Sequence, residues 1–71
     1  MPSDVIQNKL ESLRKCLLRL EQKRPGSPEI LVSDYDIQDI ISINLERAIQ
    51  ISVDIAAHLL AEVYSIITNT P

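Results

Sequence analysis

The sequence has 71 residues and a formal net charge of −3, with one cysteine and two tyrosines as its only aromatic residues. A chain of this length forms at most one small domain, in which apolar burial and the loss of chain entropy nearly cancel. One cysteine excludes an intrachain disulfide and a cysteine-based zinc site, and no uncharged run approaches the roughly 18 residues that span a membrane. We therefore expect one helical domain over residues 1–71 of a cytoplasmic protein, with no membrane contact, no metal and no cofactor.

The first segment predicts a helix over about residues 4–23. Asp4, followed three residues later by Gln7, is typical of a variant capping box at the start of a helix. Pro25 and Gly26 prevent the helix from continuing. Apolar residues alternate at steps of four and three, which indicates an a/d-like seam made of Ile6, Leu10, Leu13, Leu17 and Leu20.

Residues 24–36 contain the only glycine and two of the four prolines, and so predict a loop. Within it, residues 29–32 form a short apolar patch that fits one helical turn lying over the end of a bundle. Ser33, Asp34 and Asp36 could each cap the next helix. We place the cap within residues 34–36, where negative charge favours a helix N-terminus.

A second, longer helix is predicted over about residues 36–67, since this segment contains neither glycine nor proline. Its apolar residues form two adjacent faces, so its partners must lie on two sides. The first face, which we predict to be the dimer or bundle interface, consists of Ile41, Leu45, Ala48, Ile55, Leu59, Val63 and Ile66. The second consists of Ile49, Val53, Ala56, Leu60, Tyr64 and Ile67.

These elements predict an all-α fold, an antiparallel two-helix hairpin of about residues 4–23 and 36–67. The helices differ in length, about 30 Å against about 45 Å, so the apolar side chains near residues 59–67 have no partner in the same chain. Two hairpins that pair their apolar faces would complete a four-helix bundle by dimerisation.

Charge is divided unevenly along the chain. Residues 1–24 carry a net charge of +3 and residues 25–71 a net charge of −6. In one interpretation the two helices attract one another. In the other, five cations offer a basic patch to RNA or to an acidic partner: Arg14, Lys15, Arg19, Lys23 and Arg24. Because no aromatic residues interleave with them and the chain is acidic, the sequence alone does not support nucleic-acid binding.

Four polar residues follow steps of three, four and four along the long helix, which places them on one stripe: Arg47, Gln50, Asp54 and His58. In a metal-independent nuclease such a stripe could orient a catalytic histidine or bind a phosphate. The structural alternative is an Asp54–His58 pair beside Arg47 and Gln50. A metal at His58 is disfavoured, because only Asp54 would supply a second ligand.

Several stretches resemble a known family at matching spacing: residues 4–9 (DVIQNK), 13–17 (LRKCL), 34–39 (DYDIQD), 44–50 (NLERAIQ) and 53–58 (VDIAAH). Together they are similar to the N-terminal half of HepT-like proteins of the HEPN superfamily. The resemblance covers essentially the whole chain. It implies a helical bundle that forms a homodimer and acts as a metal-independent, RNA-cleaving toxin of a toxin–antitoxin pair. It also implies neutralisation by a small nucleotidyltransferase of the MntA type.

The catalytic motif of that family, Arg-x4-His-x-Tyr, lies in its C-terminal half and has no match in this chain. Arg47 lies eleven positions before His58, and Tyr64 lies six positions after it. We therefore expect a fragment, a natural truncation or a shortened relative that has no catalytic residues and retains dimerisation or antitoxin binding. The alternative is a non-enzymatic helical homodimerisation module. RNA is expected as a partner only of the complete family domain.

Overall fold

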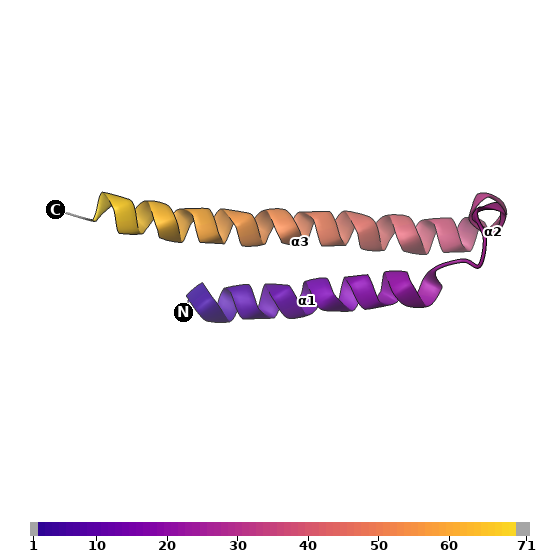
Figure 1. The fold of residues 1–71 in the computed structure, drawn as a ribbon, viewed down its shortest axis with the longest axis horizontal. Coiled ribbons are helices and arrows are strands. Elements are labelled where there is room, and N and C mark those ends of the chain that lie inside the picture. Colours follow the sequence, from indigo (N-terminus) through magenta and orange to yellow (C-terminus); the bar gives the residue numbers. More distant parts are fainter. Residues whose placement is uncertain (1, 70–71) are drawn as a thin grey trace.

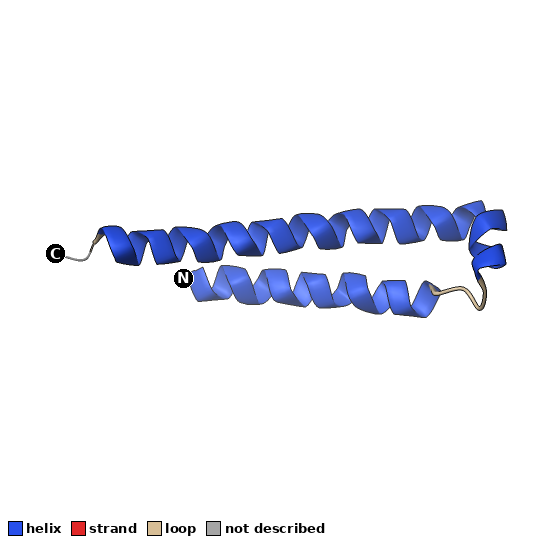
Figure 2. Ribbon diagram, turned by 45° about the horizontal axis from the view of Figure 1, so that its top comes forward, coloured by secondary structure: helices blue, strands red, loops and turns tan. Residues whose placement is uncertain are grey.

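The computed structural model describes residues 2–69, which form a helical hairpin (Figure 1). Helix α1 spans Pro2–Lys23, α2 spans Pro28–Ser33 and α3 spans Tyr35–Thr68. Helices α1 and α3 run antiparallel, and α2 lies at the turn between them (Figure 2). The prediction of an all-α hairpin is thus confirmed for the described residues, with both long helices within two residues of their expected ends.

The predicted capping box at the start of α1 is wrong. Asp4 is the third residue of the helix, which begins at Pro2, and so cannot be the cap that precedes it. Proline suits the first turn, because its missing N–H has no acceptor there and its φ angle is already helical. The carboxylate of Asp4 instead lies in the first turn, where it complements the helix dipole.

Asp34 caps α3 and resolves the choice that the sequence left open. Its Oδ1 accepts a hydrogen bond from the backbone N–H of Ile37 at 3.1 Å, and its backbone is extended at φ −105° and ψ 101°. Its own N–H donates to the carbonyl oxygen of Ile30 at 2.9 Å, which closes the end of α2. One residue therefore ends one helix and begins the next.

The patch at residues 29–32 belongs to α2, a six-residue helix and not a single turn. Gln38 of α3 holds it in place, because its Nε2 donates to the carbonyl oxygens of Leu31 and Val32 at 2.8 and 2.9 Å. Leu31 is half-buried, whereas Val32 remains 74% exposed. The helix thus covers the end of the hairpin through one leucine and two hydrogen bonds, not through a broad apolar contact.

The seam between α1 and α3 differs from the predicted one. Leu10 and Leu17 are 46% and 53% exposed, whereas Cys16 is buried and Lys9 is half-buried. The residues of α1 that turn toward α3 are thus Ile6, Lys9, Leu13, Cys16 and Leu20. On α3 the most covered positions within the same span are Ile41, Asn44, Ala48, Ile51 and Ile55. Small side chains at Cys16 and Ala48 let the helices approach closely, which rotates two leucines out to the side.

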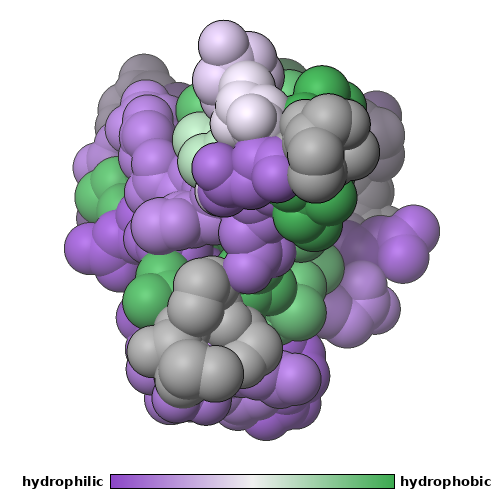
Figure 3. Space-filling model, turned by 90° about the vertical axis from the view of Figure 1, so that its left-hand side faces the viewer, coloured by the Kyte–Doolittle hydropathy of each residue, from purple (hydrophilic) through white to green (hydrophobic). Residues whose placement is uncertain are grey.

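Two helices enclose little core. Among the described residues only Cys16, Asn44 and Ala48 are buried, and no side chain is fully buried. The hairpin extends over 60 × 17 × 15 Å with a radius of gyration of 17.0 Å. A compact chain of the same length would have a radius of gyration of about 11 Å. Figure 3, a view from the end where α3 finishes, shows hydrophobic groups reaching the surface at several places.

The hairpin has two unlike sides, because in an antiparallel pair the same flank of each helix faces the same way. We call one side the apolar flank, formed by Leu10, Leu17, Ile41, Leu45, Ile49, Leu59 and Val63. Leu17, Ile41 and Leu45 line one common hollow, which confirms that the two helices meet on this side. The opposite side, the polar flank, is formed by Lys15, Arg19, Arg47, Gln50, Asp54 and His58.

The last turns of α3 extend beyond α1, as the unequal helix lengths predict (Figure 1). Lys9 contacts Asp54. Pro2, the first residue of α1, lies seven positions before Lys9. Because the helices are antiparallel, α1 therefore begins about opposite Ala61, seven positions after Asp54. Val63 and Tyr64 in the uncovered part are 52% and 68% exposed. On length and composition alone, α3 is also apolar enough to cross a membrane, a test that the core helix of a soluble bundle passes as well.

Replacing the cap of α3 tests its contribution. Asp34→Ala removes the hydrogen bond to the Ile37 N–H and should lower the free energy of unfolding by about 1 kcal/mol. The control is Asp36→Ala, because Asp36 lies in the same first turn but its carboxylate accepts no hydrogen bond within the described residues. That control loses only a dipole interaction, about 0.3 kcal/mol. Urea unfolding followed by circular dichroism at one protein concentration measures both, and equal losses would contradict the capping role.

Candidate functional site on the polar flank

The predicted polar stripe lies on the polar flank of α3, but its members do not form one cluster. Gln50 Nε2 donates to Asp54 Oδ1 at 3.2 Å. No hydrogen bond or ion pair joins Asp54 to His58 within the described residues, so the Asp54–His58 pair that the spacing allowed does not form. Arg47 faces a different neighbourhood, which it shares with α1. The stripe therefore divides between two places on α3.

Asp54 binds across the hairpin to Lys9. The Lys9 Nζ donates to Asp54 Oδ2 at 3.4 Å, and the two side chains are 29% and 41% exposed. Each carboxylate oxygen of Asp54 thus has one donor, one from α1 and one from Gln50. The contact joins the two helices, and its exposure keeps its contribution to stability small.

His58 lies beyond this contact, toward the end of α3. It is exposed and lines a small hollow of about 270 Å³ with Asp54, Ala57 and Ala61. Its ring makes no hydrogen bond within the described residues. Residues 2–69 also contain no group of three histidine, cysteine or acidic side chains that could hold a metal ion. The stripe therefore contains no base–nucleophile pair that the described residues hold in place.

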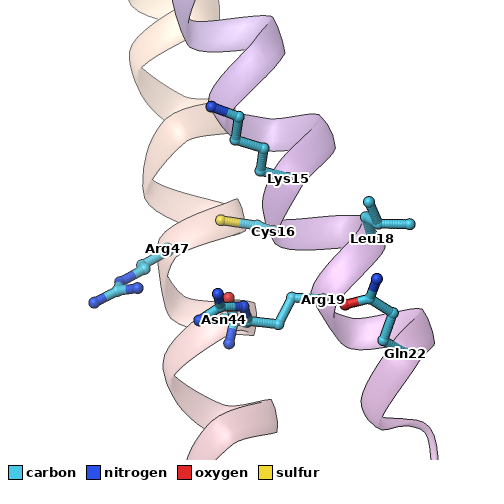
Figure 4. A pocket seen from close by; sticks show the side chains of 7 residues that line it. All are labelled: Lys15, Cys16, Leu18, Arg19, Gln22, Asn44 and Arg47. Carbon is cyan, nitrogen blue, oxygen red and sulfur yellow. The ribbon is translucent and has the colours of Figure 1, made fainter.

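Arg47 lines a pocket of about 340 Å³ between α3 and α1 (Figure 4). Lys15 and Arg19 of α1 line the same pocket, as do Gln22 and Leu18. In Figure 4, Arg19 extends across toward α3, whereas Leu18 points away from it. The side chain of Arg47 is directed away from α1 (Figure 4), so three cationic residues from two helices border one pocket without their charged groups all pointing into it.

Two buried side chains form the floor of this pocket. Asn44 is 4% exposed, and its Nδ2 donates to the carbonyl oxygen of Ile40 at 2.8 Å. This bond uses one of its two N–H groups and leaves the side-chain oxygen without a donor from the described residues. Cys16 lies beside it with its sulfur directed toward α3 (Figure 4). Asn44 is thus a polar residue in the helix seam with hydrogen-bonding capacity to spare at the pocket.

The five cations proposed as one basic patch are separated by the fold. Arg14 pairs with Glu11 on the same helix, with contacts of 2.8 and 3.1 Å. The hydrogen bond from Arg14, and then its charge, lower the pKa of the Glu11 carboxyl, and the same contact raises the pKa of Arg14. Arg24 lines the hollow on the apolar flank. Of the patch, only Lys15 and Arg19 share the pocket with Arg47.

The sequence analysis did not predict that two polar residues, Lys9 and Asn44, lie in the seam between the helices. Lys9 occupies the seam between Ile6 and Leu13, and Asn44 occupies it between Ile41 and Ala48. Both positions continue the steps of three and four, so a seam drawn on spacing alone would have included them. The predicted seam of α1 included only apolar residues, and it therefore contained Leu10 and Leu17, which are exposed, in place of Lys9 and Cys16.

The chain is similar to the mRNA nuclease HepT of Shewanella oneidensis, with 32% identity over 57 residues. The match covers 80% of this chain and 42% of the relative, so the chain spans less than half the length of the protein that it matches. This finding confirms the resemblance to HepT-like proteins. No family model matches the chain. No solved structure matches it significantly.

The contact between Lys9 and Asp54 can be measured by a double-mutant cycle. Lys9→Met keeps the apolar stem of the lysine, and Asp54→Asn keeps the shape of the carboxylate. We expect a coupling free energy below about 1 kcal/mol, since both side chains reach solvent. The coupling should decrease as salt is added, because screening weakens exposed pairs. A coupling of 2 kcal/mol or more that does not respond to salt would contradict this account.

Proposed function

We propose that this HepT-like chain is a helical association module, whose 71 residues dimerise through the apolar flank and do not cleave RNA by themselves. In this proposal residues 1–71 form one helical domain that corresponds to the N-terminal half of a HepT-like domain. The apolar flank is the single observation that carries it, because a hairpin with no fully buried side chain needs a further surface to pack against.

The exposed surface is large enough for a stable dimer. The chain has an accessible surface of 5687 Å². A compact monomer of 8.0 kDa would expose about 4,450 Å², so the excess is about 1,200 Å². Interfaces of standard size bury about 800 Å² per partner, and obligate dimers bury more. One copy of the same hairpin could therefore cover the excess.

Charge favours a particular arrangement of the two copies. The half that contains α1 carries +3 and the half that contains α3 carries −6. A two-fold axis parallel to the helices would place α1 of one chain over α3 of the other, so that opposite charges border the interface. The result is a four-helix bundle whose core contains leucines and isoleucines that are exposed in the single hairpin.

The charged groups of α3 also weigh against the membrane alternative. A single α3 crossing a bilayer would bring Asp54 and Glu62 into the hydrocarbon or close to it. Each such charge costs about 2.5–3.5 kcal/mol at the centre of a spanning helix. In a water-exposed dimer Asp54 keeps its contact with Lys9 and no charge has to enter hydrocarbon. Self-association through the apolar flank therefore covers apolar side chains without placing a charge in hydrocarbon, whereas a lone membrane span does not.

We propose that RNA cleavage, the activity of the family, requires residues that this 71-residue sequence does not contain. The relative is named an mRNA nuclease, and 42% of it is matched here. The printed sequence contains no Arg-x4-His-x-Tyr, and His58 has no side chain that orients it within the described residues. An MntA-like nucleotidyltransferase antitoxin remains a proposed partner on the resemblance alone, and calorimetric titration with such a protein would test it.

Self-association is tested by sedimentation velocity at micromolar concentration, where we expect a dimer. Leu45→Asp places a carboxylate in the proposed interface and should weaken the dimer about tenfold or more, since a buried unpaired charge is costly. Ala57→Asp is the matched control, because it adds the same charge to α3 at an exposed position away from the apolar flank. A well-folded wild-type monomer, or equal effects of the two substitutions, would overturn the proposal.

Cleavage is tested by incubating the purified 71-residue chain with an mRNA transcript and separating the products on a denaturing gel. We expect no cleavage above that of a mock-purified sample, because the described residues hold no acid–base pair in place. His58→Gln distinguishes contamination from genuine activity. Cleavage by the wild-type chain that is lost in this variant would show that the chemistry lies within these residues.

A further inference from the structure

We propose that the pocket lined by Lys15, Arg19 and Arg47 binds a phosphoryl group, supplied by a free nucleotide or by an RNA phosphodiester. The pocket lies on the polar flank, on the side of the hairpin away from the proposed dimer interface. Its occupation therefore does not depend on self-association, on an antitoxin or on cleavage.

The charges of the pocket call for an anion. Its lining contains three cations and no carboxylate. Within the described residues, the ion pairs are those of Lys9 with Asp54 and of Arg14 with Glu11, so none of the three cations has an acidic partner. This local excess of positive charge lies in a chain whose net charge is −3.

The hydrogen-bonding groups suit phosphoryl oxygens. The two arginines carry planar forks of N–H donors that match phosphate, and Lys15 adds a point charge. Asn44, at the buried floor, has one N–H that its bond to Ile40 does not use. Gln22 adds a further side-chain amide at the rim. Donors thus reach the pocket from both helices, which suits a tetrahedral group with several oxygens better than a single planar carboxylate.

The size and lining of the pocket indicate what kind of ligand fits. Its volume of about 340 Å³ lies at the lower end of the range for small-molecule sites. No aromatic side chain lines it, so it offers no surface on which a base could stack. We therefore expect recognition of the phosphoryl group without preference for base sequence, and an affinity that falls steeply as salt is added.

Nuclear magnetic resonance titration of the 71-residue chain at low salt tests the site. The probes are inorganic phosphate, adenosine monophosphate and a short single-stranded oligouridylate. Saturable shifts at the Asn44 side-chain amide and at Arg19 and Arg47 are expected with at least one probe. Saturation by phosphate and the mononucleotide assigns a free nucleotide as the source, whereas saturation by the oligonucleotide alone assigns RNA. Absence of saturable shifts with all three overturns the proposal.

Substitutions of single arginines distinguish binding in this pocket from general electrostatic attraction of an anion to the basic helix α1. Arg19→Gln and Arg47→Gln should each weaken binding of the responsive probe by about threefold to tenfold. If that probe is RNA, each should also reduce the salt slope by about 0.7. Arg14→Gln is the matched control, because it removes the same charge from α1 outside the pocket. Equal weakening by all three variants overturns the proposal. Circular dichroism and sedimentation of the same samples separate this result from unfolding or from loss of the dimer.

Discussion

The seam between α1 and α3, in which Cys16 and Ala48 are buried, is the contact on which the rest of this structure depends. Two small side chains are buried in the seam, and Lys9 contacts Asp54 across it. In this arrangement Leu10 and Leu17 are exposed to solvent and lie with Leu45 of α3 on the apolar flank. The contact that holds the hairpin together thus also creates the surface that needs a partner.

Two unlike flanks follow from this arrangement. One exposes leucines of α1 with leucine and isoleucine of α3, and on the other Lys15, Arg19 and Arg47 border a pocket with a buried asparagine. Because the flanks face opposite ways, association through one leaves the other open to solvent. The proposed assembly surface and the proposed anion site therefore lie on separate faces of the hairpin.

Asn44 illustrates how a polar residue contributes to such a seam. It satisfies one N–H within its own helix and retains further hydrogen-bonding groups at the pocket. Because its hydrogen bond lies within α3, the buried amide is partly satisfied whatever the position of α1. The contact of Lys9 with Asp54 lies at the rim. Of the two polar contacts, only that of Lys9 with Asp54 joins one helix to the other.

The sequence by itself determined the helical class, the antiparallel hairpin, the turn at Pro25 and Gly26, and the unequal helix lengths, because these depend on local periodicity and on residues that break helices. It also supported the family resemblance, which depends on residue identity and spacing. Tertiary structure decided which of three capping residues is used, which face of α1 meets α3, and that Arg47 joins Lys15 and Arg19 while Asp54 turns to Lys9. Those choices depend on the rotation and register of one helix against another, and positions along a single helix do not encode them.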